Sequence, residues 1–110
     1  MGSIKQVAKL IDSGGKRVAE FLLPPETDAP WHRHSSVVEY CYCLSGQLDF
    51  EREGSEPITL NPGEHCEVPF GVTHRVVNRN RRDCRFLIVQ NGDYYDFVQL
   101  KNRVRQNETE

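Results

Sequence analysis

Four side chains have the types and the spacing of a metal site. His32 and His34 are separated by one residue, and in a β-strand two such residues point to the same face. Glu39 follows on the same segment, and His74 comes just after the turn sequence Pro69–Gly71. Imidazole nitrogens and a carboxylate oxygen suit Fe(II), Mn(II), Ni(II), Zn(II) or Cu(II), with positions left open for water or a substrate. The four residues therefore predict a site for one divalent transition metal ion.

Each of these residues also has an ordinary interpretation. A single histidine at a strand end usually faces solvent or makes a hydrogen bond, and one carboxylate among 16 acidic groups carries little information. We expect His65 to be a histidine of this ordinary kind, outside the cluster. The metal hypothesis rests on the joint spacing of three of the four histidines and one glutamate.

Short apolar segments must position these side chains. Apolar residues repeat at spacing two or in short blocks, and Gly, Pro, Asn or Asp interrupts them at intervals of eight to twelve residues. This pattern is typical of an all-β sandwich or barrel. We predict strands over Ile4–Leu10, Arg17–Leu23, Val37–Leu44, Gln47–Arg52, Ile58–Leu60, Glu64–Val68, His74–Asn78, Arg85–Gln90 and Tyr95–Leu100.

The chain length limits the number of domains. Its 110 residues, 37% of them hydrophobic, suffice for one domain with one core. We expect a single barrel over residues 1–100 and a polar segment over residues 101–110, either a frayed tail or a short exposed helix. No apolar run approaches the roughly 18 residues of a membrane span, and the N-terminus has no signal-peptide pattern. A soluble, cytoplasmic protein without a membrane partner is the expectation.

The charge balance argues against a nucleic-acid partner. Sixteen acidic and fourteen basic side chains give a formal net charge of −2, whereas phosphate binding needs a concentrated positive surface. A local concentration of positive charge is the arginine cluster Arg75, Arg79, Arg81, Arg82 and Arg85. Asn and Asp residues interrupt this cluster, so a solvated turn is favoured there over a weak anion-binding patch.

The cysteines are expected to be reduced and structural. Cys41, Cys43, Cys66 and Cys84 form no C-x2-C pair of the kind that binds zinc. Each lies among strand-like apolar neighbours, where a free cysteine behaves as a small buried hydrophobic residue. We therefore favour interior packing over redox chemistry.

Two segments resemble the motifs of a known family. The first, HRHSSVVEYCYCLSG, runs from His32 to Gly46, and it resembles the first cupin motif, in which H-x-H is followed by Glu and then by Gly. The second, GEHCEVPFGVTHRVVN, runs from Gly63 to Asn78. It resembles the second cupin motif, G-x5-P-x-G-x2-H-x3-N, at every fixed position. Together the motifs and the spacer cover under half of the chain.

The resemblance implies a small single-domain cupin. Its fold would be all-β, a cupin-type double-stranded β-helix or jelly-roll barrel, and the four residues above would be the metal ligands. Glu26 stands where the first motif begins with Gly, and Gly permits backbone shapes that Glu does not. The resemblance also assigns purely structural roles to the turn residues Gly46, Gly63, Pro69 and Gly71.

Strand alternation predicts which neighbours of Glu39 point inward. If Glu39 faces the barrel interior, Cys41 and Cys43 share its face, while Tyr40 and Tyr42 face the opposite way. Small thiol side chains would then line the interior beside the metal. A cysteine as an additional soft ligand is the alternative.

The residues around the mouth of the pocket are less clearly specified. Trp31 and Phe70 flank the ligand segments, and we weigh apolar walls of the pocket mouth equally against plugs of the core. Arg33 and Arg75 each follow a ligand directly, so alternation turns both away from the metal.

Three functions are carried forward, in decreasing order of preference. The first is a dioxygenase-like, metal-dependent oxidoreductase acting on a small oxygen-bearing organic substrate; a metal-dependent isomerase, cyclase or lyase of a sugar-like or keto acid is its enzymatic alternative. Glu39 is the candidate catalytic base in either case. The second is a non-catalytic module that senses a small ligand or a metal, and the third is a structural or storage role.

The expected partners are a small-molecule substrate and a second copy of the chain. A barrel of this length leaves edge strands near both termini. Ile4–Leu10 or Tyr95–Leu100 is expected to pair across a two-fold axis to form a homodimer.

Overall fold

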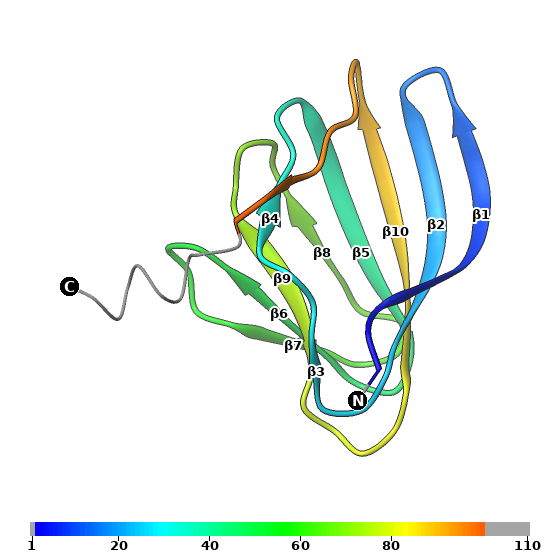
Figure 1. Cartoon of the computed structure of the whole chain (residues 1–110), viewed down its shortest axis with the longest axis vertical. Coiled ribbons are helices and arrows are strands. Elements are labelled where there is room, and N and C mark those ends of the chain that lie inside the picture. Colours follow the sequence, from blue (N-terminus) through cyan, green and yellow to red (C-terminus); the bar gives the residue numbers. More distant parts are fainter. Residues whose placement is uncertain (1, 101–110) are drawn as a thin grey trace.

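The fold consists of two antiparallel β-sheets that face each other, as predicted (Figure 1). The structure is a computed structural model and describes residues 2–100. Sheet A contains, in spatial order, β1 (Lys5–Ser13), β2 (Lys16–Leu23), β10 (Cys84–Gly92), β5 (Val37–Ser45) and β8 (His65–Val68). Sheet B contains β11 (Val98–Gln99), β4 (His32–Arg33), β9 (His74–Asn78), β6 (Leu48–Arg52) and β7 (Ile58–Leu60), and β3 (Thr27–Asp28) also pairs with β9.

The C-terminal part of the predicted strand pattern needs correction. Only Val98–Gln99 of the predicted strand Tyr95–Leu100 is paired, with β4, because residues 93–97 run as a loop from sheet A to sheet B. Figure 1 shows this loop in orange after β10. The two-residue strands β3 and β4 were not predicted, since prolines surround them and runs of two residues carry no periodicity. The expected polar segment 101–110 lies outside the described residues.

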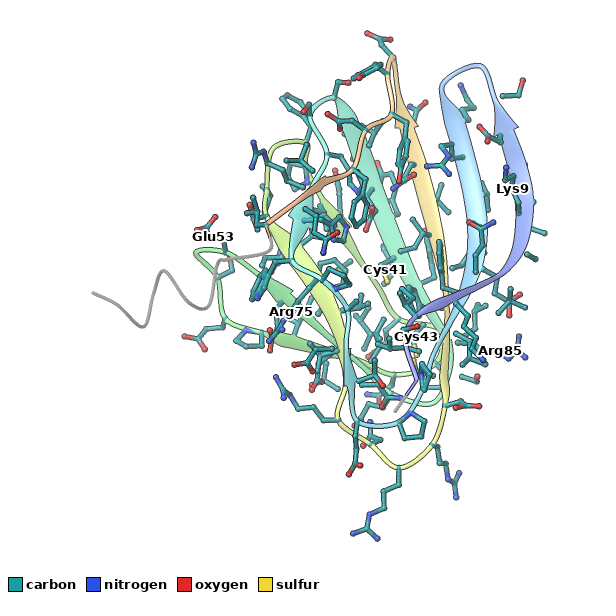
Figure 2. The ribbon with its side chains drawn as sticks, viewed as in Figure 1. Lys9, Cys41, Cys43, Glu53, Arg75 and Arg85 are labelled. Atoms are coloured by element: carbon teal, nitrogen blue, oxygen red, sulfur yellow. The ribbon has the colours of Figure 1, made fainter. Side chains whose placement is uncertain are left out.

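The core lies between the two sheets and follows the alternation of the strands. On β5, Val37, Glu39, Cys41 and Cys43 are buried, while the intervening residues are partly exposed. All four cysteines are buried and free, as expected, and burial raises the pKa of the Cys66 thiol to about 11. Figure 2 shows Cys41 and Cys43 in the interior between the sheets. The thiols therefore pack as small apolar side chains.

Glu26 occupies a backbone conformation that normally favours glycine. Its φ angle is 53°, in the left-handed region, and its amide donates a hydrogen bond to the carbonyl of Asn80 over 3.2 Å. The family motif has Gly at this position, so the loop keeps a glycine-like shape although the residue differs. Glu26 is the one non-glycine residue among 2–100 with positive φ.

Asn78, the last fixed residue of the second motif, holds two loops together. It is 1% exposed, and its Nδ2 donates to the carbonyls of Leu23, Pro24 and Arg82 at 3.0, 3.1 and 2.8 Å. Its Oδ1 accepts from the amide of Asn80. The side chain therefore fixes the end of β2 against the loop that follows β9.

Three of the five arginines of the cluster form ion pairs. Arg75 and Arg79 both bind Glu51, over 2.7 and 2.6 Å, and Arg85 binds Glu20 over 2.7 Å. Figure 2 shows Arg85 at the periphery. These pairs occupy the guanidinium groups of three of the five arginines of the cluster, so those three groups do not form an anion-binding patch. Residues 2–100 contain no helix that is long and apolar enough to span a membrane.

Candidate metal centre

The structure brings all four candidate ligands to one point between the two sheets. His32 and His74 belong to sheet B and are directly opposite each other on β4 and β9, His34 follows β4, and Glu39 comes from β5 of sheet A. Each offers one ligand atom, and these atoms lie within 4.8 Å of one another. His65 stays outside this cluster, stacked on Tyr42 at 4.6 Å between ring centroids, as expected.

Backbone carbonyls determine which nitrogen each histidine presents to the centre. Nδ1 of His32 lies 3.0 Å from the carbonyl oxygen of Pro30, Nδ1 of His34 lies 2.6 Å from that of Asp96, and Nδ1 of His74 lies 2.8 Å from that of Val72. A carbonyl can only accept, so each Nδ1 carries the proton and donates. Nε2 is thereby left to bind a cation, which is the arrangement found around metal-bound histidines.

Glu39 contacts two of these histidines. Its Oε1 lies 3.0 Å from His34 Nε2, and its Oε2 lies 3.2 Å from His74 Nε2. When His74 carries its proton on Nδ1, its Nε2 and the carboxylate oxygen are both acceptors and cannot bond to each other. His74 Nε2 is accordingly buried without a hydrogen-bond partner. A buried acceptor facing a carboxylate is the local environment that a bound cation satisfies, so the cluster fits a metal ion.

Glu39 and His32 are held in the forms that bind a metal, whereas His34 carries a proton that a metal must displace. Burial opposes ionisation of Glu39, but the adjacent imidazoles of His34 and His74 outweigh it and hold the pKa of this carboxyl well below its usual range. Burial, together with the neighbouring His74, lowers the pKa of His32 to about 4, so its imidazole is neutral near pH 7. The pKa of His34 is raised, because hydrogen bonds to Glu39 and to the Asp96 carbonyl outweigh its burial. A metal ion binding here would displace the proton held between His34 and Glu39.

A cavity of about 230 Å³ opens beside the four ligands. This volume lies below the usual range of pockets for drug-sized molecules, so it suits a smaller ligand. One wall is apolar and is formed by inward residues of β2 and β10, among them Ala19, Phe21, Phe86 and Ile88. The site thus combines three candidate imidazole ligands and one candidate carboxylate ligand with an apolar wall that excludes water.

Several residues of the lining were missed in the sequence, and four of them contact a candidate ligand or one another. Arg17 and Gln90 face the cavity from β2 and β10, and Tyr95 and Phe97 reach it from the loop before β11. Phe97 stacks on His32 with 4.3 Å between ring centroids. Strand alternation along β2 and β10 indicates that Arg17 and Gln90 point inward. Tyr95 and Phe97 were missed because they lie in a loop that the sequence pattern predicted as a strand.

The predictions for the mouth of the pocket are partly wrong. Neither Trp31 nor Phe70 lines the cavity: Trp31 stacks against Arg75, with the guanidinium carbon 4.7 Å from the ring centroid, and Phe70 is 61% exposed. Phe70 is therefore neither a wall nor a core plug. The prediction for Arg75 holds, because this side chain turns away from the metal cluster to bind Glu51 and Asp28.

The anchoring of the mouth loop was also not predicted. Asp96 accepts hydrogen bonds from the amide and the hydroxyl of Ser35, over 2.7 and 2.6 Å, through its two carboxylate oxygens. Its own carbonyl accepts from His34. One residue of the loop thus binds the segment next to a candidate ligand and orients that ligand.

The fold and the site define a double-stranded β-helix with a three-histidine, one-glutamate cluster able to bind a metal ion. The family model for the cupin domain matches residues 19–90, and the chain belongs to this family. The matched residues contain both motifs and all four candidate ligands.

Similar proteins cover different shares of the fold. An oxalate-binding protein from Thermotoga maritima is 30% identical over 71 residues, which are 64% of this chain and 58% of that protein. The crystal structure of an uncharacterised protein with a double-stranded β-helix domain from Klebsiella pneumoniae superposes with a TM-score of 0.80 at 15% identity, covering 91% of this chain and 86% of the other. A DMSP lyase from Ruegeria pomeroyi gives a TM-score of 0.69 at 26% identity, covering 81% of this chain and 44% of the lyase.

Proposed function

We propose that this chain is a metal-dependent oxidoreductase of the dioxygenase type, acting on a small oxygen-bearing organic substrate. The observation that carries the proposal is the cluster of His32, His34, Glu39 and His74, with ligand atoms within 4.8 Å of one another. These four residues would hold one divalent transition metal ion. Such an ion, with open coordination positions, supplies Lewis-acid polarisation of a substrate oxygen and, where it is redox-active, chemistry with dioxygen.

The residues of the chain itself would orient the substrate and accept a proton. Glu39 is the candidate base, because its carboxylate is buried and adjacent to the cavity. Gln90 donates to Glu39 Oε1 over 2.8 Å and would keep this carboxylate in place. The apolar wall formed by Phe21, Phe86 and Ile88 would exclude water from the reacting substrate.

A second candidate is a metal-dependent isomerase, cyclase or lyase. One observation favours it: the phenol of Tyr95 belongs to the cavity lining and offers an acid separate from Glu39. The similarity to a DMSP lyase at 26% identity agrees with this alternative. A third candidate, a binding module without turnover, is favoured by the similarity to an oxalate-binding protein.

The metal centre is tested by elemental analysis of the purified protein. We expect about one transition metal ion per wild-type chain and loss of that ion in His74→Ala and in Glu39→Gln. His65→Ala is the matched control, since this histidine lies outside the cluster and must keep the metal. Thermal unfolding identifies any variant that fails to fold. A folded His74→Ala or Glu39→Gln protein with full metal occupancy contradicts the proposed site.

The reaction class is tested with an oxygen electrode and a panel of small diketones, flavonols and hydroxy acids. Substrate-dependent oxygen uptake by the metal-loaded protein, absent in Glu39→Gln, supports the dioxygenase proposal. Conversion of a panel member without oxygen uptake supports an isomerase, cyclase or lyase instead. Tight binding without any product supports the binding module.

The cysteines and the charged surface bear on the cellular location and the partners of the protein. We propose a cytoplasmic location, which four free, buried cysteines support because reduced thiols persist in a reducing compartment. The absence of a nucleic-acid partner remains our expectation, supported by the ion pairs of Arg75, Arg79 and Arg85. Comparing the redox state of the thiols in fresh cell extract with that in the purified protein tests the location.

A further inference from the structure

Arg17 is a cationic group that faces the cavity beside the metal cluster. It is the second residue of β2 and belongs to the cavity lining. Its guanidinium carbon lies 3.7 Å from the centroid of the Tyr95 ring, and Nη1 donates to Gln90 Oε1 over 3.4 Å. Contact with the aromatic face holds the planar guanidinium in place without using its N–H donors.

The carboxylate contacts of Arg17 differ from those of other arginines. Arg75, Arg79 and Arg85 each form an ion pair of 2.6 or 2.7 Å with a glutamate. Arg17 Nε is 3.8 Å from Asp12 Oδ1, beyond hydrogen-bond distance, and the Asp12 side chain is 46% exposed. A guanidinium presents five N–H donors in a fork that fits a carboxylate. Arg17 therefore retains donor capacity at the wall of the cavity.

The register of sheet A sets the separation between Arg17 and the metal cluster. Arg17 pairs with Gln90 on β10, and Gln90 pairs with Glu39 on β5. These three residues form one row across the sheet, with Gln90 between the cation and the candidate ligand. Neighbouring strands are about 4.8 Å apart, so the backbones of Arg17 and Glu39 are separated by roughly 10 Å. A ligand that reaches both ends must have several atoms between its two anchoring groups.

We propose that Arg17 binds a carboxylate of the substrate. The substrate class is then a small organic acid whose carboxylate is separated by a short carbon chain from the oxygen that binds the metal. The cavity volume of about 230 Å³ limits its size, and the wall of Ala19, Phe21 and Ile88 contacts its carbon chain. This inference rests on the proposed metal centre, which supplies the second anchor.

The test compares two ligands that differ by one carboxylate. Glutarate offers one carboxylate to the metal and one to Arg17, whereas butyrate offers only one. Zn(II)-loaded protein is used because zinc has no redox chemistry, and dissociation constants are measured by calorimetry. We expect glutarate to bind wild-type protein at least about tenfold more tightly than butyrate, which corresponds to one additional charged hydrogen-bonded pair.

Substitutions assign this preference to Arg17. Arg17→Gln is expected to remove the preference for glutarate over butyrate, and Arg17→Lys is expected to retain part of this preference. Arg85→Gln, which removes an exposed arginine at the opposite end of the same strand pair, must keep the full preference. Thermal unfolding and zinc content are measured for each variant, and Arg17→Lys replaces Arg17→Gln in the comparison if the latter does not fold.

The outcomes separate the two proposals. Failure of the wild-type protein to bind zinc overturns the metal centre. Stoichiometric zinc with equal affinity for glutarate and butyrate, or a glutarate preference that survives in Arg17→Gln, overturns the role of Arg17 and leaves the metal centre intact.

Discussion

Gln90 Nε2 donates a hydrogen bond to Glu39 Oε1 over 2.8 Å, across the β10–β5 pair in which the two residues are direct partners. Gln90 is 6% exposed and also lies 3.4 Å from His34 Nε2. It therefore contacts two of the four candidate ligands without belonging to the cluster. Its amide restricts the rotation of the Glu39 carboxylate, which is the usual function of residues that support metal ligands.

Gln90→Leu is expected to weaken metal affinity about 10- to 100-fold without unfolding the protein, because the Glu39 carboxylate loses its donor while the side-chain volume is kept. Titration against a competing chelator measures the affinity. Gln47→Leu is the control, since Gln47 is exposed and bonds to Asn61. Unchanged affinity in Gln90→Leu would show that the carboxylate needs no support.

Glu26→Gly is expected to stabilise the protein. A side chain in the left-handed region costs about 1–2 kcal/mol, and the greater freedom of Gly in the unfolded chain offsets part of this gain. At a φ of 53°, we expect a net gain of about 1 kcal/mol in the free energy of unfolding, measured by chemical denaturation. Glu56→Gly, in an exposed loop without positive φ, should give no gain. Equal effects at both sites would contradict this account of Glu26.

Glu51 provides a pH-dependent contribution to stability. Burial raises the pKa of its carboxyl, but hydrogen bonds from Arg75 and Arg79 outweigh burial and lower the pKa below its ordinary value of 4.5. A carboxylate with a lowered pKa stabilises the fold above the unfolded-state pKa, and this contribution is lost as the pH falls through the folded-state pKa.

Glu51→Gln should therefore reduce the free energy of unfolding by about 1 kcal/mol at pH 7, and the difference from wild type should shrink below pH 4.5. Thermal unfolding across this pH range measures the difference. Glu67→Gln, at an exposed position of β8, serves as the control. A difference that stays constant or grows in acid is the contrary result.

Asn78→Ala is expected to destabilise the protein by about 3 kcal/mol, because the carbonyls of Leu23, Pro24 and Arg82 lose a shared buried donor. Denaturant unfolding measures the loss. The exposed Asn61, whose side chain bonds to Gln47, gives the control Asn61→Ala, for which a change below about 0.5 kcal/mol is expected. Comparable effects of the two substitutions would mean that Asn78 does not act as a clamp.

A homodimer remains our expectation, and of the two candidate edges we propose β1 as the contact. This strand is at the edge of sheet A and exposes Val7, Leu10 and Ile11. Two register shifts interrupt β1, so we expect contact through side chains rather than through a continuous hydrogen-bonded ladder. Light scattering should give twice the chain mass for wild type, and Leu10→Lys should give monomers. Leu44→Lys, at another exposed leucine, should leave the dimer intact; a monomeric wild type would remove the proposal.

The residues of the site fall into those that motif spacing identifies and those that depend on strand alternation. The His32-x-His34 pattern and the second motif ending in Asn78 place the candidate ligands at fixed intervals, so these are accessible from the sequence. Arg17 and Gln90 were missed, although Arg17 alternates with Ala19 and Phe21, and Gln90 alternates with Phe86 and Ile88. The same alternation that identified the buried Cys41 and Cys43 predicts that Arg17 and Gln90 point inward.

The mouth loop is a different case. Tyr95 and Phe97 have the composition of a strand, and a period of two over so few residues does not distinguish a paired strand from an extended loop. The bond between His34 and the Asp96 carbonyl joins residues 62 positions apart in the chain. Such a contact arises from tertiary packing, and local pattern carries no signal for it.

The candidate ligands come from both sheets, with Glu39 on β5 of sheet A and the histidines on or beside β4 and β9 of sheet B. β4 has only two residues and meets β9 at the single pair His32–His74. An ion held by all four side chains would therefore link sheet A to sheet B, and it would also hold β4 to β9, which the backbone joins at one residue pair only. Removal of the ion with a chelator should increase the rate of amide hydrogen exchange first in β4 and around Asp96, and only later in the β5–β10 pair.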